Sequence, residues 1–293
     1  MSTATKLTLA GILAIMYGPS ESALTAWQES DWPNGETLSQ RFVVSDVPDI
    51  VIRNSTDGRT TVRASEGDEV RVRTIADGRD AEDLEVLIDQ EGNRITVEVR
   101  RPHRRWFSWG RSPRMHIEIE APRRSDVDAR NDDGRLTVSG IEGRLVLSVD
   151  DGDLLVSDTS GELRARGDDG DLDLRDVGGS VDVRTDDGDL ELNGVLSAVR
   201  ASTDDGDLNI RAEAGSSLQR AWTINADDGD IWLMVADDLA ADLTLRTDDG
   251  GIDVEPPISV MGRSSRSHLS GQLNGGGAEL RVTSDDGHIS ITR

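Results

Sequence analysis

The chain has 293 residues, enough for one large domain or two small ones. Only 3% of its residues are aromatic and 35% are hydrophobic, so a core must be built from Leu, Val, Ile and Ala. The formal net charge of −25 repels nucleic acid and anionic lipid, and the absence of Cys excludes disulfides, thiolate zinc sites and cysteine nucleophiles.

Residues 1–26 have the features of a secretory signal peptide. Lys6 is followed by an apolar run over residues 7–17, and small residues beyond it allow cleavage after Ala23 or Ala26. These eleven apolar residues are too few for a membrane span, which needs about 20. We therefore predict export to the periplasm or the cell surface, with no transmembrane segment in the mature chain.

Residues 27–125 form a β-rich but less regular part. Short runs of alternating apolar and polar residues predict strands with one buried face. These runs lie at residues 37–45, 49–54, 59–64, 69–74, 84–89, 94–100 and 115–120. The segment 56–73, TDGRTTVRASEGDEVRVR, resembles a degenerate copy of the repeats that follow. We expect this part to continue into those repeats without a linker.

Residues 100–114, RRPHRRWFSWGRSPR, break this pattern with six Arg, one His and no acid. The segment lies between two predicted strands, which indicates a loop. Arg beside aromatic side chains can bind sugars, anionic polymers or a lipid headgroup surface. The candidate partner-binding residues are Arg104, Arg105, Trp106, Phe107 and Trp109. The alternative is that the loop folds back and caps the end or edge of its own acidic solenoid.

Residues 126–293 are repeats marked by Asp-Asp-Gly, with the Gly at 134, 152, 170, 188, 206, 229, 250 and 287. The first five copies are 18 residues apart, and the later intervals are 23, 21 and 37. Apolar residues follow each Gly by two and four positions, as Leu190 and Leu192 do in TDDGDLELNG, 185–194. A second apolar pair, such as Val181 and Val183, stands in the other half of most units. Each unit therefore holds two short strands and two turns.

A single unit cannot bury its own apolar face, but stacked units with parallel strands about 4.8 Å apart bury a continuous core. The predicted fold class is all-β: a parallel, two-sheet β-solenoid with mostly 18-residue rungs and a less regular β-rich N-terminal part. A β-sandwich is the structural alternative, although its strands would not keep an 18-residue register. Residues 255–274 interrupt the last repeats and are predicted to be a polar excursion.

The repeats make the chain resemble a known family. The resemblance is carried by TDDGDLELNG (185–194), INADDGDIWLMVADDLAADLTLRTDDGGIDV (224–254), GGGAELRVTSDDGHISITR (275–293) and MHIEIEAPRRSDVDARNDDGRL (115–136). The chain is similar to the bacterial putative-adhesin family of envelope β-solenoids, which is related to the putative autotransporter-adhesin head domain family. This resemblance implies the fold and brings no catalytic motif. The chain differs from the family in the first two Asp of each turn, where members usually carry Ser or Asn.

The turn carboxylates raise the main question about function. Asp and Gly suffice as turn residues, but equal charges one rung apart repel by about 0.9 kcal/mol in water. Residues 146–210 hold 18 acidic and 5 basic residues. Solvent and salt can relieve this repulsion, and so can side chains that lean across from Arg164, Arg166, Arg175, Arg184 and Arg200.

Calcium bound between adjacent rungs is the alternative, as in calcium β-rolls, which also use 18 residues per turn. The candidate ligands are Asp151, Asp153, Asp169, Asp171, Asp187, Asp189, Asp205 and Asp207. We favour solvated turns and no cofactor, because the glycine doublet of β-rolls is missing and the second turn of each unit has no regular Asp.

A repeating ladder gives all its carboxylates nearly the same environment, whereas a glycosidase needs two different ones. The four His residues show no metal-binding or triad spacing. We therefore predict a non-enzyme, an adhesin-like binding or scaffold protein of the cell envelope. Its expected partner is an envelope or surface component, a glycan or a protein, and not a nucleic acid. The alternatives are a calcium-binding β-roll and a polysaccharide-acting β-helix enzyme.

Overall fold

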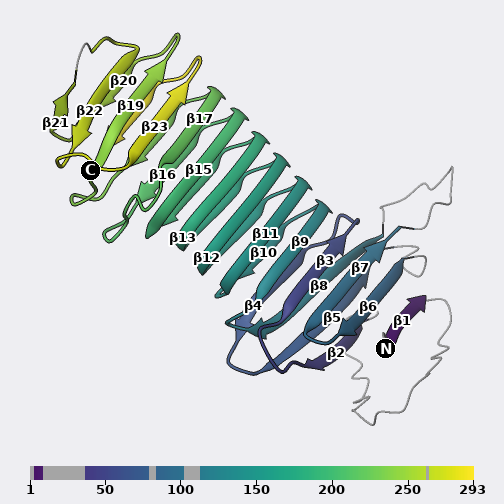
Figure 1. Ribbon diagram of the computed structural model, residues 1–293. Coiled ribbons are helices and arrows are strands. Elements are labelled where there is room, and N and C mark those ends of the chain that lie inside the picture. The colour runs from purple at the N-terminus through teal and green to yellow at the C-terminus, as the bar shows by residue number, and fades with distance from the viewer. Residues whose placement is uncertain (1–2, 9–36, 79–83, 102–112, 262–263) are drawn as a thin grey trace, which may run out of the picture. The chain divides into compact units, whose positions relative to one another are not determined.

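A computed structural model describes residues 3–8, 37–78, 84–101, 113–261 and 264–293. The described residues form strands and turns and no helix, so none of their segments is a helix able to cross a membrane. The chain divides into two compact units, Met1–Glu142 and Gly143–Arg293. Strands account for most of the described residues of each unit, which confirms the predicted all-β class (Figure 1).

The first unit contains every strand predicted between residues 37 and 120, with ends that differ by at most three residues. Its strands are β1 (Thr3–Thr8), β2 (Thr37–Val43), β3 (Asp49–Asn54), β4 (Thr60–Ser65), β5 (Glu69–Asp77), β6 (Glu85–Glu91), β7 (Arg94–Arg100), β8 (Arg114–Pro122), β9 (Asp126–Asp133) and β10 (Leu136–Ser139). β1 falls within the predicted signal peptide and pairs antiparallel with β6.

The strands of the first unit pair in two runs, β1-β6-β7-β3-β9 and β2-β5-β8-β4-β10. β3 and β4 are parallel to both of their neighbours and lie between strands that come later in the chain. The predicted degenerate repeat, residues 56–73, is therefore a rung only in its first half. There Gly58 stacks on Gly134, and a Cβ on Gly134 would lie 2.8 Å from the Gly58 carbonyl oxygen.

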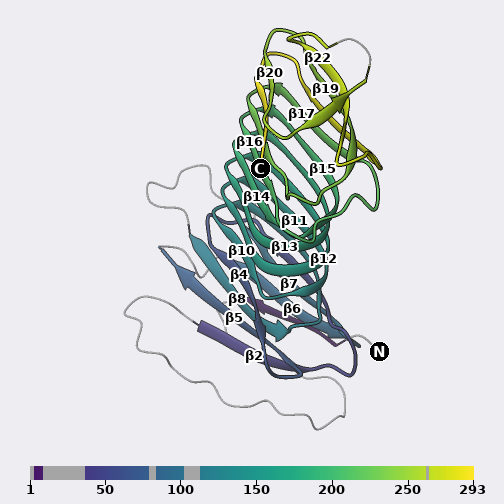
Figure 2. The ribbon, with the colours of Figure 1, turned by 90° about the vertical axis from the view of Figure 1, so that its left-hand side faces the viewer.

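The second unit is the regular part of the solenoid. Its strands are β11 (Glu142–Asp151), β12 (Leu154–Asp169), β13 (Leu172–Asp187), β14 (Leu190–Gly194), β15 (Leu196–Asp205), β16 (Leu208–Ala212), β17 (Trp222–Asp228), β18 (Ile231–Met234), β19 (Ala241–Thr247), β20 (Ile252–Val254), β21 (Ile258–Val260), β22 (His268–Leu273), β23 (Glu279–Ser284) and β24 (Ile289–Thr292). Figures 1 and 2 show the rungs that these strands form, stacked side by side.

The predicted apolar columns form the core of these rungs. Leu172, Leu190 and Leu208 stand in register on neighbouring parallel strands, and each is at most 1% exposed. Burial of one such side chain contributes about 2 kcal/mol. Ile252, from the same predicted column, is only half-buried, because β20 has a single parallel neighbour, β24. The columns thus end at the last rung.

The last repeat in the sequence is not the last rung of the stack. β23 lies between β17 and β19 (Figure 1), and β24 lies between β18 and β20, with all four pairings parallel. The outer rung, formed by β19 and β20, therefore comes earlier in the sequence than β23 and β24, which form the rung beneath it.

The prediction that residues 255–274 are only a polar excursion is wrong. This segment contains β21 and β22, and β22 pairs antiparallel with both β19 and β21. A terminal rung leaves a row of unpaired backbone groups on its outer edge. The hairpin partners that row along β19, which explains why a mostly polar segment forms strands here.

Candidate functional site: the acidic turns

The Asp-Asp-Gly turns of the second unit stack in close contact. Gly188 has a φ of 140°, and a Cβ there would lie 2.3 Å from the Gly170 carbonyl oxygen. Its N–H donates to the carbonyl oxygen of Asp205 in the next turn, at 3.0 Å. Only Gly combines this backbone conformation with so close an approach. The turn glycine is thus fixed by geometry before any chemistry is considered.

The Asp that follows the turn glycine forms a ladder of hydrogen bonds to backbone. The N–H of Asp189 donates to Asp171 Oδ1 at 3.2 Å, and the N–H of Asp207 donates to Asp189 Oδ1 at 2.9 Å. The ladder continues from Asp230 N–H to Asp207 and from His288 N–H to Asp230, at 2.9 and 2.7 Å. Three calcium candidates, Asp171, Asp189 and Asp207, therefore each use one carboxylate oxygen to hold the next rung.

In successive rungs, Arg neutralises the first Asp of the turn. Arg166 forms ion pairs with Asp168 of its own rung at 3.2 Å and with Asp186 of the next rung at 3.4 Å. Arg184 repeats this with Asp186 at 3.1 Å and Asp204 at 3.2 Å. The hydrogen bond to Asp186 and the two negative charges raise the pKa of Arg184. The predicted compensation by Arg is confirmed for these two side chains.

Two further Arg side chains form ion pairs with carboxylates outside the Asp-Asp-Gly turns. Arg175 pairs with Asp173 at 2.6 Å and with Glu191 of the next rung at 3.6 Å. Arg164 pairs with Glu162 at 2.9 Å, in its own rung. Exposed pairs of this kind contribute little individually, but here they offset repulsion between stacked carboxylates.

The second Asp of each turn presents its carboxylate to solvent. Asp151, Asp169, Asp187 and Asp205 are exposed, and within the described part of the chain their carboxylates have no hydrogen bond or ion pair. The eight calcium candidates thus fall into two columns with different environments. No group of three or more His, Asp or Glu side chains among the described residues could hold a metal ion.

The Asp189 and Asp187 columns predict different effects of the same substitution. Asp189→Ala removes the acceptor of the Asp207 N–H and is expected to lower the free energy of unfolding by about 1 kcal/mol or more. Asp187→Ala removes only a repelling charge and is expected to change it by less than about 0.5 kcal/mol, or to raise it. Urea denaturation of both variants measures the difference, and equal losses would show that the two columns do not differ.

The predicted partner-binding residues Arg104, Arg105, Trp106, Phe107 and Trp109 lie outside the described residues. The residue that leads into their segment, Arg101, forms an ion pair with Asp57 and lies 3.8 Å from Asp133. Both carboxylates belong to stacked turns of the first unit. The basic segment thus begins at a guanidinium fixed to an acidic turn.

The Arg101–Asp57 ion pair, which anchors the start of the basic segment, predicts that the stability of the protein depends on pH. Partial burial alone would raise the pKa of Asp57, but the hydrogen bond and charge of Arg101 outweigh burial and lower it below 3.8. A carboxyl with a lowered folded pKa stabilises the fold above its unfolded value and loses that contribution as the pH falls through the folded value. We expect Arg101→Gln to raise the pKa of Asp57 and to destabilise the protein at neutral pH, by a margin that shrinks below about pH 4.

An NMR titration of the Asp57 carboxyl and urea denaturation across pH measure these effects. Arg100→Gln is the matched control, because Arg100 pairs with Glu98 at 2.5 Å and not with the turns. An unchanged Asp57 pKa in Arg101→Gln would contradict the anchor.

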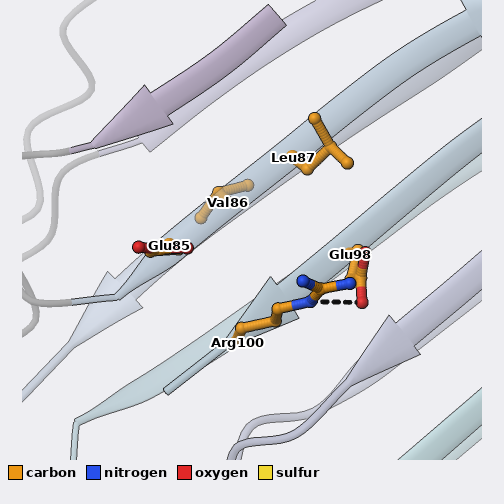
Figure 3. Close-up of a pocket in the computed structure, with 5 residues that line it drawn as sticks. All are labelled: Glu85, Val86, Leu87, Glu98 and Arg100. Carbon is orange, nitrogen blue, oxygen red and sulfur yellow. Dashed lines mark hydrogen bonds and ion pairs between the residues drawn. The ribbon is translucent and has the colours of Figure 1, made fainter. Parts of the chain in front are cut away.

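A pocket in the first unit has the dimensions of a surface recess and not of an active site. It is lined by Glu85, Val86, Leu87, Glu98 and Arg100 of β6 and β7 (Figure 3) and has a volume of about 70 Å³. Binding sites for small molecules are typically about 300–1,000 Å³. The Glu98–Arg100 ion pair crosses one side of it, so both charged groups are already partnered.

The stacked turns and register agree with a comparison to protein families. A model of the family described as Toastrack DUF4097 matches residues 47–292. The chain belongs to the Toastrack family. This match covers both units and confirms the predicted resemblance to putative-adhesin β-solenoids, together with the fold class. The relation to the autotransporter head domain stays a prediction.

Solved structures similar to this Toastrack chain come from several bacteria. A putative lipid binding protein of Parabacteroides distasonis has 12% identity and a TM-score of 0.42, covering 89% of this chain and 98% of its own. A putative adhesin of Bacteroides fragilis has 12% identity and a TM-score of 0.39, covering 88% and 96%. A putative cell adhesion protein of Clostridium sporogenes has 9% identity and a TM-score of 0.29, covering 88% and 99%. No curated protein matches the chain.

Proposed function

We propose that this Toastrack protein is exported and acts as a non-catalytic, adhesin-like binding or scaffold protein of the bacterial cell envelope. The observation that carries the proposal is repetition: Asp171, Asp189 and Asp207 each accept the backbone N–H of the matching Asp in the next rung in the same way. Acid–base catalysis of glycoside cleavage needs two carboxyl groups tuned apart. Stacked rungs instead offer extended, rigid faces, which repeat proteins use for binding.

Export is supported by the composition of residues 1–26 and tested by the fate of the chain in a bacterium. We expect cell fractionation to find the protein outside the cytoplasm and N-terminal sequencing to place the cleavage after Ala23 or Ala26. Leu13→Arg, which interrupts the apolar run, is expected to block export. An uncleaved wild-type chain that stays in the cytoplasm would overturn this part of the proposal.

Binding is tested by sedimenting the mature protein with isolated cell walls and with membranes. We expect the protein to co-sediment with one of these fractions and to release no reducing ends from a panel of polysaccharides. Release of reducing ends would instead indicate an enzyme. Replacing Trp106, Phe107 and Trp109 by Ser separates the two roles predicted for residues 100–114, a binding loop or a cap on the solenoid. Lost binding with unchanged stability favours a contact site, and lost stability favours a cap.

A further inference from the structure

Trp232 is exposed on the outward face of a regular sheet. It lies on β18, in the run of parallel strands β14, β16, β18, β24 and β20, and is 40% exposed. Its neighbours along the strand, Ile231 and Leu233, are buried in the core, so the indole projects outward from a strand paired on both sides. Trp222, by contrast, is fully buried. Exposure of so large an apolar side chain on a rigid strand contributes nothing to the core.

The residues beside Trp232 on the neighbouring strands are polar and share its face. Asn209 on β16 and Ser290 on β24 stand directly opposite it in register, about 4.8 Å to either side. One strand further out stand Glu191 on β14 and Asp253 on β20. The row therefore consists of one aromatic ring flanked by an amide, a hydroxyl and two carboxylates.

Asp253 is held in place by His288, the residue just before the neighbouring strand β24. His288 Nε2 lies 3.1 Å from Asp253 Oδ2, and the His288 backbone N–H donates to Asp230 at 2.7 Å. The carboxylate ladder of the turns thus ends at the histidine that orients Asp253. The position of Asp253 is therefore fixed, through His288, by the same ladder of carboxylates that holds the turns together.

A flat ring with flanking amide, hydroxyl and carboxylate groups matches the chemistry of a sugar. One face of a pyranose carries C–H groups, which are apolar and slightly positive and stack on the electron-rich face of an indole. Its hydroxyls require donors and acceptors at the sides of that face. We propose that Trp232 is the stacking platform for a neutral sugar ring of an envelope glycan, with Asn209, Ser290 and Asp253 binding its hydroxyls.

Charge and polarity favour a neutral glycan over the other occupants. The net charge of −25 and the carboxylates in the row disfavour polyanions and anionic lipid. A protein interface centred on Trp232 would need surrounding contacts that exclude water from a larger area, whereas its register neighbours here are polar. This inference rests on the proposed envelope-binding function and names the site and the ligand class.

The test uses the mature chain and three probes: hexasaccharides of β-1,4-linked glucose, N-acetylglucosamine and xylose. We expect at least one to bind by isothermal titration and to change the tryptophan fluorescence. Trp232→Ala is expected to weaken that binding by about 10-fold or more, and Asn209→Ala by less. The control is Val195→Ala, since Val195 is also exposed, at 45%, but lies outside the row.

The outcomes separate this inference from the function on which it rests. If none of the three probes binds, or if Trp232→Ala binds as the wild type does, the sugar platform is overturned. It is also overturned if Trp232→Ala abolishes binding to an isolated envelope protein and leaves sugar binding unchanged. In each case co-sedimentation of the wild type with cell walls or membranes still decides the proposed function. Unchanged melting temperatures of the variants exclude unfolding as the cause of lost binding.

Discussion

Val282→Asp is expected to lower the free energy of unfolding by about 4 kcal/mol or more. Val282 is fully buried on β23, and it stands in register with Ile224 of β17 and Leu245 of β19. A carboxylate at this position has no partner and no water, which is among the most destabilising changes available to a core. Because β23 separates two rungs, its loss detaches the outer rung from the stack.

Urea denaturation and amide hydrogen exchange measure this effect. We expect faster exchange at the amides of β19 and β22, while β13 stays protected. The matched control is Arg281→Ser, one residue away, because Arg281 is exposed and pairs only with Glu279 of its own strand among the described residues. A chain that ends at Ala278 is expected to behave like Val282→Asp. Protection of β19 in that shortened chain would contradict the inserted position of the last repeat.

Gly188→Ala is expected to destabilise the protein by about 3 kcal/mol. The substitution combines a left-handed backbone conformation, which costs about 1–3 kcal/mol for a residue with a Cβ, with a contact of 2.3 Å to the Gly170 carbonyl oxygen. The rung has to move away from its neighbour to relieve this contact, which weakens the hydrogen bonds of the turn.

Gly275→Ala separates backbone strain from stacking. Gly275 also has a positive φ, 89°, but a Cβ there meets no atom within 4 Å. We expect this variant to lose only about 1 kcal/mol. Urea denaturation of the two variants gives the difference, and equal losses would show that the turns are not stacked as closely as described.

The periodicity of the repeats was enough to predict the fold. Apolar residues two and four positions after each turn glycine identified one pair of buried columns. The second pair of columns also keeps the period, because Val127 and Ala129, 18 residues before Leu145 and Leu147, are buried. The order of the rungs could not be predicted in the same way. Every repeat carries the same columns, so β23 fits beside β17, β19 or any other rung, and pairing energy alone does not encode chain order.

The candidate site was predicted less completely than the fold. Turn chemistry explained why Asp and Gly recur, but it could not distinguish Asp189, which accepts a backbone N–H, from Asp187, which faces solvent. That difference depends on the direction of each side chain relative to the next rung. Trp232 was missed, although its signal was in the sequence: an aromatic residue at a position that is mostly polar in the other repeats.

We expect the turn carboxylates to build the solenoid and charge its surface without binding metal. Thermal melting of the mature protein in millimolar calcium chloride, compared with sodium chloride at equal ionic strength, tests this claim most directly. We expect equal shifts in melting temperature, because both salts screen the repulsion between rungs. A shift in calcium well beyond that in sodium would show that the folded protein binds calcium, and would contradict this expectation.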